Sequence, residues 1–141
     1  MKFFYYYSVF TLTLAFGVSV YVAWLFLAPV HLDGVYNEPF PVYPAEVSVG
    51  ETLYWEVEYS KDNDYTVDIN RNIICGDDLV TLAPESTNVP QTERSLVTGS
   101  VVIPSKAGVG TCFVELRAEY HINKLRTIQK TFKTQEFDII Q

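Results

Sequence analysis

The feature that most constrains this chain is an uncharged, apolar run near its start. No Asp, Glu, Lys, Arg or His occurs between residues 3 and 30. Wound as an α-helix, this run would extend about 40 Å, which exceeds the ~30 Å hydrocarbon core of a bilayer. Backbone groups inside lipid have no water to bond, so a segment that crosses the membrane must be helical. The sequence therefore predicts one transmembrane helix, with the hydrocarbon span at residues 9–28.

Two interpretations compete for residues 1–30, a retained anchor and a cleaved signal peptide. A signal peptide has an apolar run of about 7–15 residues and a cleavage site of small residues. The run here is roughly twice that length, and Pro29 directly after Ala28 disfavours cleavage. Aromatic residues near both ends of the run resemble the belts found at the two surfaces of a bilayer. They are Phe3, Phe4, Tyr5, Tyr6, Tyr7, Tyr21 and Trp24. We expect a retained anchor that binds the lipid bilayer through residues 9–28.

The charges that flank the run predict its orientation. Lys2 precedes it, whereas Asp33 and Glu38 follow it. Flanks on the cytoplasmic side tend to carry Lys and Arg. We therefore expect a single-pass membrane protein with a cytoplasmic N-terminus and an extracytoplasmic C-terminal domain.

The remainder of the chain divides into a linker and one domain. Residues 31–44 hold three prolines, which favour an extended, semi-rigid spacer. Residues 45–141 form a domain of ordinary size. The part beyond residue 30 carries all 17 acidic residues and all but one of the 10 basic residues. An acidic surface disfavours phosphate backbones, so nucleic acid is not expected as a partner.

Alternating hydrophobicity predicts an all-β domain. Residues 52–60 and 111–122 alternate apolar and polar side chains along their full length, which is typical of strands with one buried face. Shorter runs at 45–49, 65–75, 79–82, 95–103 and 126–133, and a last one near 137–140, are bounded by turn residues. Residues 83–92 hold two prolines and predict a surface loop. About seven short strands of this kind indicate an antiparallel β-sandwich.

The two cysteines, Cys75 and Cys112, both lie in the part expected outside the cytoplasm. An even number of cysteines in an oxidising compartment suggests one disulfide. Such a bridge would stabilise the fold by about 3–4 kcal/mol in the chain-entropy model. Two buried free thiols are the alternative.

Several segments resemble a known fold family. Residues 101–104, the glycines Gly108 and Gly110, the long alternating strand that reaches Tyr120, and the final Phe137-x-Ile139 strand resemble the last strands of an immunoglobulin-like domain. The resemblance covers about residues 42–141. It implies an immunoglobulin-like antiparallel β-sandwich preceded by a single N-terminal transmembrane helix. Residues 120–126 also resemble small anchored proteins encoded by tailed bacteriophages.

The immunoglobulin resemblance has implications for the disulfide and for the membrane-facing end. The second strand lacks the family's cysteine and holds Trp55 instead, so Cys75 would pair with Cys112. The loop at 61–64 and the turn at 123–124 would lie nearest the bilayer. Lys124 and Arg126 would then be membrane-proximal basic residues, able to interact with anionic headgroups.

No catalytic, cofactor or metal site is predicted. His31 and His121 lack a nucleophile or acid placed beside them by a recognisable motif. The residues 62–64 and Asp68 supply oxygens that suit calcium, but they lack the pattern of a known calcium loop, so solvated turn residues are the preferred interpretation. Asp77 and Asp78 belong to the opposite end of a sandwich. Aromatic residues in phase with aliphatic ones predict core packing rather than a ligand site; they are Trp55, Tyr59 and Tyr120.

These observations favour one functional hypothesis and leave one alternative. We expect a membrane-anchored, non-enzymatic protein that presents its domain for assembly or for contact with an unidentified protein partner. A phage origin would place this work at the host envelope. The alternative is an envelope-acting enzyme, or a lysis or pore-forming accessory protein, whose site no motif reveals.

Overall fold

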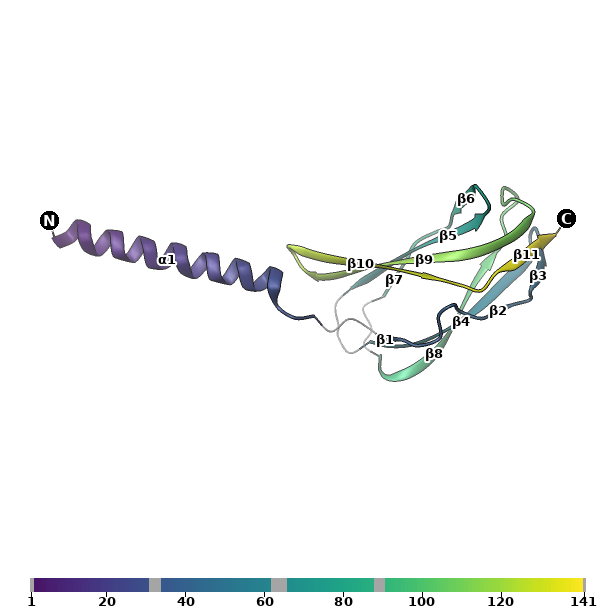
Figure 1. Cartoon of the computed structure of the whole chain (residues 1–141), viewed down its shortest axis with the longest axis horizontal. Coiled ribbons are helices and arrows are strands. Elements are labelled where there is room, and N and C mark those ends of the chain that lie inside the picture. The colour runs from purple at the N-terminus through teal and green to yellow at the C-terminus, as the bar shows by residue number, and fades with distance from the viewer. Residues whose placement is uncertain (1, 31–33, 62–65, 88–90, 141) are drawn as a thin grey trace.

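The computed structural model describes residues 2–30, 34–61, 66–87 and 91–140. One long helix, α1 (Lys2–Leu27), extends away from a β-domain (Figure 1). The short strands are β1 (Gly34–Val35), β2 (Val42–Tyr43), β3 (Glu46–Ser48), β6 (Asp78–Thr81), β7 (Glu85–Thr87) and β11 (Phe137–Ile140). The long strands are β4 (Thr52–Lys61), β5 (Val67–Cys75), β8 (Gln91–Val102), β9 (Gly110–Asn123) and β10 (Arg126–Lys133).

The apolar helix predicted at the start of the chain is confirmed. None of its span from Phe3 to Leu27 is buried against the protein, and it is the one helix in the described residues long and apolar enough to cross a membrane. The hydroxyls of Thr11, Thr13 and Ser19 donate to carbonyls four residues earlier, so these polar groups are satisfied within the helix. Its length and composition fit a membrane anchor or a signal sequence.

The strands form two sheets. In the first, β4 is central, with β1 and β2 pairing along one edge and β8 along the other. In the second, the order is β3-β11-β9-β5-β6, with β10 also pairing with β9 and β7 with β5. All of these pairs are antiparallel except β3 with β11. The prediction of a mostly antiparallel all-β domain behind an apolar helix is therefore confirmed.

Alternation along the long strands separates buried from exposed faces as the sequence predicts. On β4 the side chains of Leu53 and Trp55 are buried, whereas Tyr54 is exposed. Gly99 of β8 pairs with Trp55, and a Cβ added there would collide with the indole ring. The glycine thus makes room for a large core side chain.

The core is uneven along the domain. A large buried cluster fills the end that bears the C-terminus and includes Val47, Ile73, Ile103 and Ile139. A second, smaller cluster lies towards the other end and consists of Val67, Ala118 and Tyr120. The end of the domain near α1 is therefore less completely packed than the far end.

The prediction of a free linker at residues 31–44 is wrong for its described part, residues 34–44. Both β1 and β2 pair with β4, and the side chain of Phe40 is 1% exposed. The prolines do not prevent this, because proline is tolerated on edge strands and beside short ones. The β-domain therefore begins by Gly34 rather than at residue 45.

The loop predicted at 83–92 is also partly wrong. Residues Glu85–Thr87 form β7 and pair with β5, while β8 begins at Gln91. A three-residue strand carries too little alternation to be recognised, and its pairing depends on contacts with a distant segment.

Candidate functional site

The hairpin between β9 and β10 contacts the end of α1 directly (Figure 1). The side-chain amide of Asn123 donates to the backbone carbonyl of Leu25 at 3.1 Å. The guanidinium of Arg126 donates to the carbonyl of Ala28 at 2.7 Å. Carbonyls in the last turn of a helix lack partners within the helix, and a cation there interacts favourably with the helix dipole. The hairpin therefore caps the C-terminal end of the helix, although the contacting residues are 98 positions apart in the chain.

The two basic residues predicted to be membrane-proximal lie at this junction. Lys124 is exposed at the tip of the hairpin, and Arg126 is partly covered by its contact with the helix end. The structure thus places both beside the end of α1. Their proximity to a bilayer stays a prediction.

Next to this junction, His121 is joined to an acidic side chain that the sequence did not connect with it. Its Nε2 lies 2.7 Å from Oδ2 of Asp68, on the neighbouring strand β5. Its Nδ1 lies 3.4 Å from the hydroxyl of Thr127 on β10. Hydrogen bonds from Ser86 and from His121 lower the pKa of the Asp68 carboxyl below its ordinary value. The sequence missed this pair because 53 residues separate its members.

A hydroxyl, an imidazole and a carboxylate in this order are the parts of a nucleophilic triad. The arrangement here is poorly suited to that chemistry. The His121 and Asp68 side chains are each 42% exposed, and the hydroxyl distance is at the limit of a hydrogen bond. Nucleophilic catalysis also needs donors for a developing oxyanion in a water-poor site, which an open sheet face does not provide. The cluster is better described as a polar clip that links β5, β9 and β10.

The polar clip leads us to predict that the stability of the folded chain depends on pH through Asp68. Because the pKa of Asp68 is lowered in the folded state, its contribution to stability is present above its unfolded pKa of about 3.9 and is lost as pH falls through the folded value. The free energies of unfolding of the native chain and of Asp68→Asn, measured in urea, should therefore differ near neutral pH, and the difference should shrink as the pH falls below the unfolded pKa. A difference that stays constant across this range would contradict the assignment.

The predicted disulfide is present. It joins Cys75 of β5 to Cys112 of β9, and the two residues are directly paired in the β5–β9 ladder. The bridge therefore lies within one sheet, at the end of the domain opposite the helix junction.

The metal interpretation gains no support. His31 and residues 62–64 lie outside the described residues. Asp77 is in the turn beside the disulfide and Asp78 begins β6, far from Asp68. Within residues 2–30, 34–61, 66–87 and 91–140, no group of three or more His, Cys, Asp or Glu side chains could hold a metal ion.

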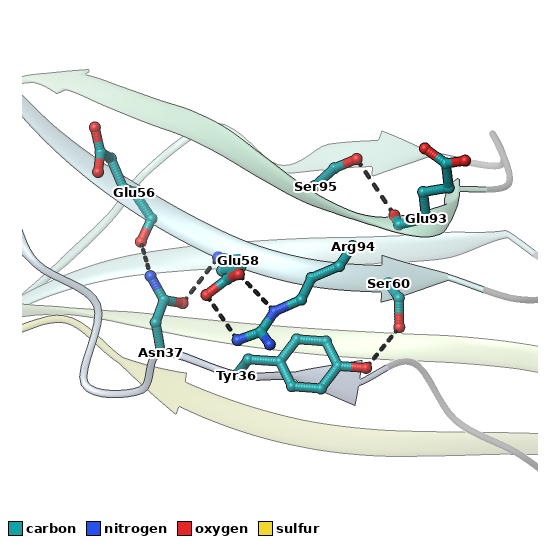
Figure 2. A network of polar contacts seen from close by, with 8 residues as sticks. All are labelled: Tyr36, Asn37, Glu56, Glu58, Ser60, Glu93, Arg94 and Ser95. Atoms are coloured by element: carbon teal, nitrogen blue, oxygen red, sulfur yellow. Dashed lines mark hydrogen bonds and ion pairs between the residues drawn. The ribbon is translucent and has the colours of Figure 1, made fainter.

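A polar network on the outer face of the first sheet ties the segment after β1 to the rest of the sheet (Figure 2). The side chain of Asn37 donates to the backbone carbonyl of Glu56 and accepts from the backbone amide of Glu58. Between β1 and β2, this side chain therefore makes the hydrogen bonds with β4 that the backbone of a neighbouring strand would otherwise make. Arg94 of β8 pairs with the Glu58 carboxylate at 2.5 Å and lies 4.3 Å from the centre of the Tyr36 ring. Tyr36 in turn shares a hydrogen bond with Ser60.

A cavity of about 490 Å³ lies between the two sheets. Inward-facing side chains of both sheets line it, among them Val57 and Tyr59 of β4 and Leu116 and Ala118 of β9. Lys61 continues the inward-facing row of β4 and is 1% exposed. The three aromatic residues predicted as core all border this space: Trp55 and Tyr120 are buried, and Tyr59 is half-buried.

Comparisons with known proteins assign no family. No family model matches the chain, and no curated protein does. Solved structures that resemble it include a Niemann-Pick type C2 protein from the Japanese carpenter ant, with 8% identity and a TM-score of 0.49. That match covers 80% of this chain and 96% of the other.

Two further solved structures also match. The alkylpurine DNA glycosylase AlkC of Pseudomonas fluorescens matches at 12% identity and a TM-score of 0.46, over 77% of this chain and 30% of the other. The sporulation control protein Spo0M of Bacillus subtilis matches at 12% identity and 0.43, over 79% and 51%. The chain thus spans about a third of the first protein and half of the second. Likenesses of this degree assign neither a fold family nor a function.

Proposed function

We propose that this chain is a single-pass membrane protein that presents an immunoglobulin-like domain for contact with another protein. The anchor is supported by α1, whose apolar side chains face away from the protein on all sides. The single basic residue before the helix, Lys2, favours a cytoplasmic N-terminus and an extracytoplasmic domain. Work at a host envelope, which the phage resemblance implies, is part of the same proposal.

The grouping of strands supports the immunoglobulin-like assignment. In that fold the second and fifth strands share one sheet, and the third, sixth and seventh strands share the other. In this chain β4 and β8 correspond to the second and fifth strands, and they pair in the first sheet. The strands β5, β9 and β11 correspond to the third, sixth and seventh, and they are neighbours in the second sheet. The disulfide departs from the family pattern, because it joins two strands of the same sheet.

The observation that carries the contact function is a set of exposed aromatic and aliphatic side chains on the outer face of the first sheet. We call it the tyrosine face; its members are Tyr36, Tyr43, Tyr54, Leu96 and Val102, each between 39% and 60% exposed. The rings of Tyr43 and Tyr54 stack with centroids 5.6 Å apart. Tyrosine is enriched at protein interfaces, and a group of exposed apolar side chains on one face is typical of an interaction site.

A partner can approach the tyrosine face from the side of β8, because this strand is at the edge of the first sheet. Within the described strands, β8 pairs with β4 alone, because β7 pairs with β5 in the other sheet. Glu58 and Arg94 provide a charged border beside Leu96. Glu56, Thr98 and Ser100 lie on the same face between its apolar members, so a partner would meet a surface of mixed apolar and polar side chains.

Site-specific photocrosslinking tests the proposal. A photoreactive amino acid replaces Leu96, or Leu79 of β6 as a matched control, in the full chain within native membranes. Both side chains are 60% exposed, but only Leu96 is on the tyrosine face. We expect a protein adduct of one discrete mass from position 96, none from 79, and loss of the adduct when Tyr54→Lys is added.

Two results would contradict the proposal. Equal adducts from positions 96 and 79, or no protein adduct from 96, would argue against a contact function and favour the alternative of an envelope-acting enzyme or pore-forming protein. Extraction of the chain from membranes by alkaline carbonate would contradict the anchor separately, without bearing on the tyrosine face.

A further inference from the structure

We propose that the cavity between the two sheets binds an acyl chain of a membrane lipid. The inference rests on the proposed anchoring, because α1 would hold the domain at the bilayer surface. It goes beyond protein contact, since the tyrosine face lies on the outside of the first sheet and the cavity lies inside.

The lining suits a hydrocarbon chain. Val35 and Val57 come from the first sheet, and Ile69, Leu116 and Phe132 come from the second. At about 490 Å³, the cavity lies within the roughly 300–1,000 Å³ range of small-molecule sites, which are mostly apolar.

The cavity extends from the main core cluster, whose members Phe40, Trp55 and Leu116 border it, towards the helix junction. Lys61 and Val67, described residues on either side of positions 62–65, border it. Tyr120, three residues before the Asn123 contact with α1, also borders it. The two sheets come together towards the end that bears the C-terminus, where the large core cluster fills the interior (Figure 1). The unfilled part of the interior is thus the part nearest the expected bilayer.

Two charged side chains also border the cavity, Lys61 of β4 and Glu85 of β7, and these two strands are in different sheets. An acyl chain that lies among the apolar residues can leave its headgroup beside these charged groups. Covering the apolar walls removes their surface from water, which is the main favourable term for such binding. These features identify the ligand class as a long-chain amphiphile.

Photolabelling of the reconstituted full chain tests this inference. Vesicles of phosphatidylcholine contain a trace of phosphatidylcholine with a diazirine at the end of one acyl chain; a second arm supplies a diazirine-labelled free fatty acid from solution. After irradiation, mass spectrometry locates the labelled peptides. We expect label on β4 and β9, in residues that line the cavity, as well as on α1.

Matched variants separate the cavity from the rest of the molecule. Val97→Trp places an indole at the cavity wall, whereas Leu96→Trp places one on the outer face of the same strand. We expect Val97→Trp to lower labelling of β4 and β9 by roughly tenfold, which corresponds to ~1.4 kcal/mol, and to leave labelling of α1 unchanged. Leu96→Trp should change neither. Ala118→Phe, which fills the cavity from the opposite sheet, should match Val97→Trp.

Each outcome is decisive. Label on β4 and β9 from the phosphatidylcholine probe supports a bilayer source, and label from the fatty acid alone supports the same site with a free amphiphile. Cavity label without α1 label would support the site and contradict the anchor. Label confined to α1 in both arms, or cavity label unaffected by both filling variants, would overturn the inference and favour an apolar protein segment as occupant.

Discussion

Replacing Phe40 by alanine is expected to lower the free energy of unfolding by about 3–5 kcal/mol, the usual cost of removing a buried aromatic side chain. Phe40 is 1% exposed and packs in the main core cluster, where its ring lies 6.1 Å from that of Phe132. Its amide donates to the carbonyl of Lys133, and its carbonyl accepts from the amide of Gln135. Residue 40 is therefore held by both its side chain and its backbone.

Urea unfolding of the full chain in nonionic detergent, followed by tryptophan fluorescence, measures this effect. Val49→Ala is the matched control, because Val49 is 42% exposed and its truncation should cost less than about 1 kcal/mol. If Phe40→Ala were as mild as the control, residues 34–44 would act as a linker and their packing against the sheets would be wrong.

Reduction of the disulfide is expected to lower the free energy of unfolding by about 4 kcal/mol, the chain-entropy value for a loop of this length. Cys75 and Cys112 are 37 positions apart in the chain. The bridge acts mainly on the unfolded chain, because the β5–β9 ladder already holds the two residues opposite each other in the folded state.

Comparing the oxidised and reduced full chain by urea unfolding isolates this term without changing a side chain. The double variant Cys75→Ala/Cys112→Ala serves as the control, because its unfolding should not respond to a reducing agent. Identical midpoints for the oxidised and reduced native chain would contradict the prediction.

Long strands could be predicted from the sequence because their burial alternates over many residues. The row from Leu53 through Trp55 to Val57 on β4 needs no knowledge of partners to be recognised, and the same holds for β9. Hydrophobic length likewise identifies α1. These features depend on local periodicity, which a single sequence contains.

Features that depend on pairing between distant segments could not be predicted. The segment around Phe40 has the prolines of a linker, whereas its pairing with β4 and with residues 133–135 involves distant parts of the chain that local pattern does not identify. Asn37 takes the place of a strand through its side chain, which no backbone pattern reveals. The Asp68–His121 contact depends on the register of β5 against β9. The cavity reflects the spacing between two sheets, while composition indicates only that aromatic residues are inside.

The network that joins Tyr36, Glu58 and Arg94 also determines how the protein would respond to mechanical load. A partner held at the tyrosine face would pull on β8, and the proposed membrane anchor would resist on the N-terminal side of β1. The shortest route between them crosses β1, β4 and β8, which are neighbours in one sheet. Arg94 spans this route, since it pairs with Glu58 on β4 and lies over the ring of Tyr36. Tension between partner and membrane would therefore pass mainly through the first sheet, while the contacts of Asn123 and Arg126 with the end of α1 give the second sheet a separate attachment to the helix.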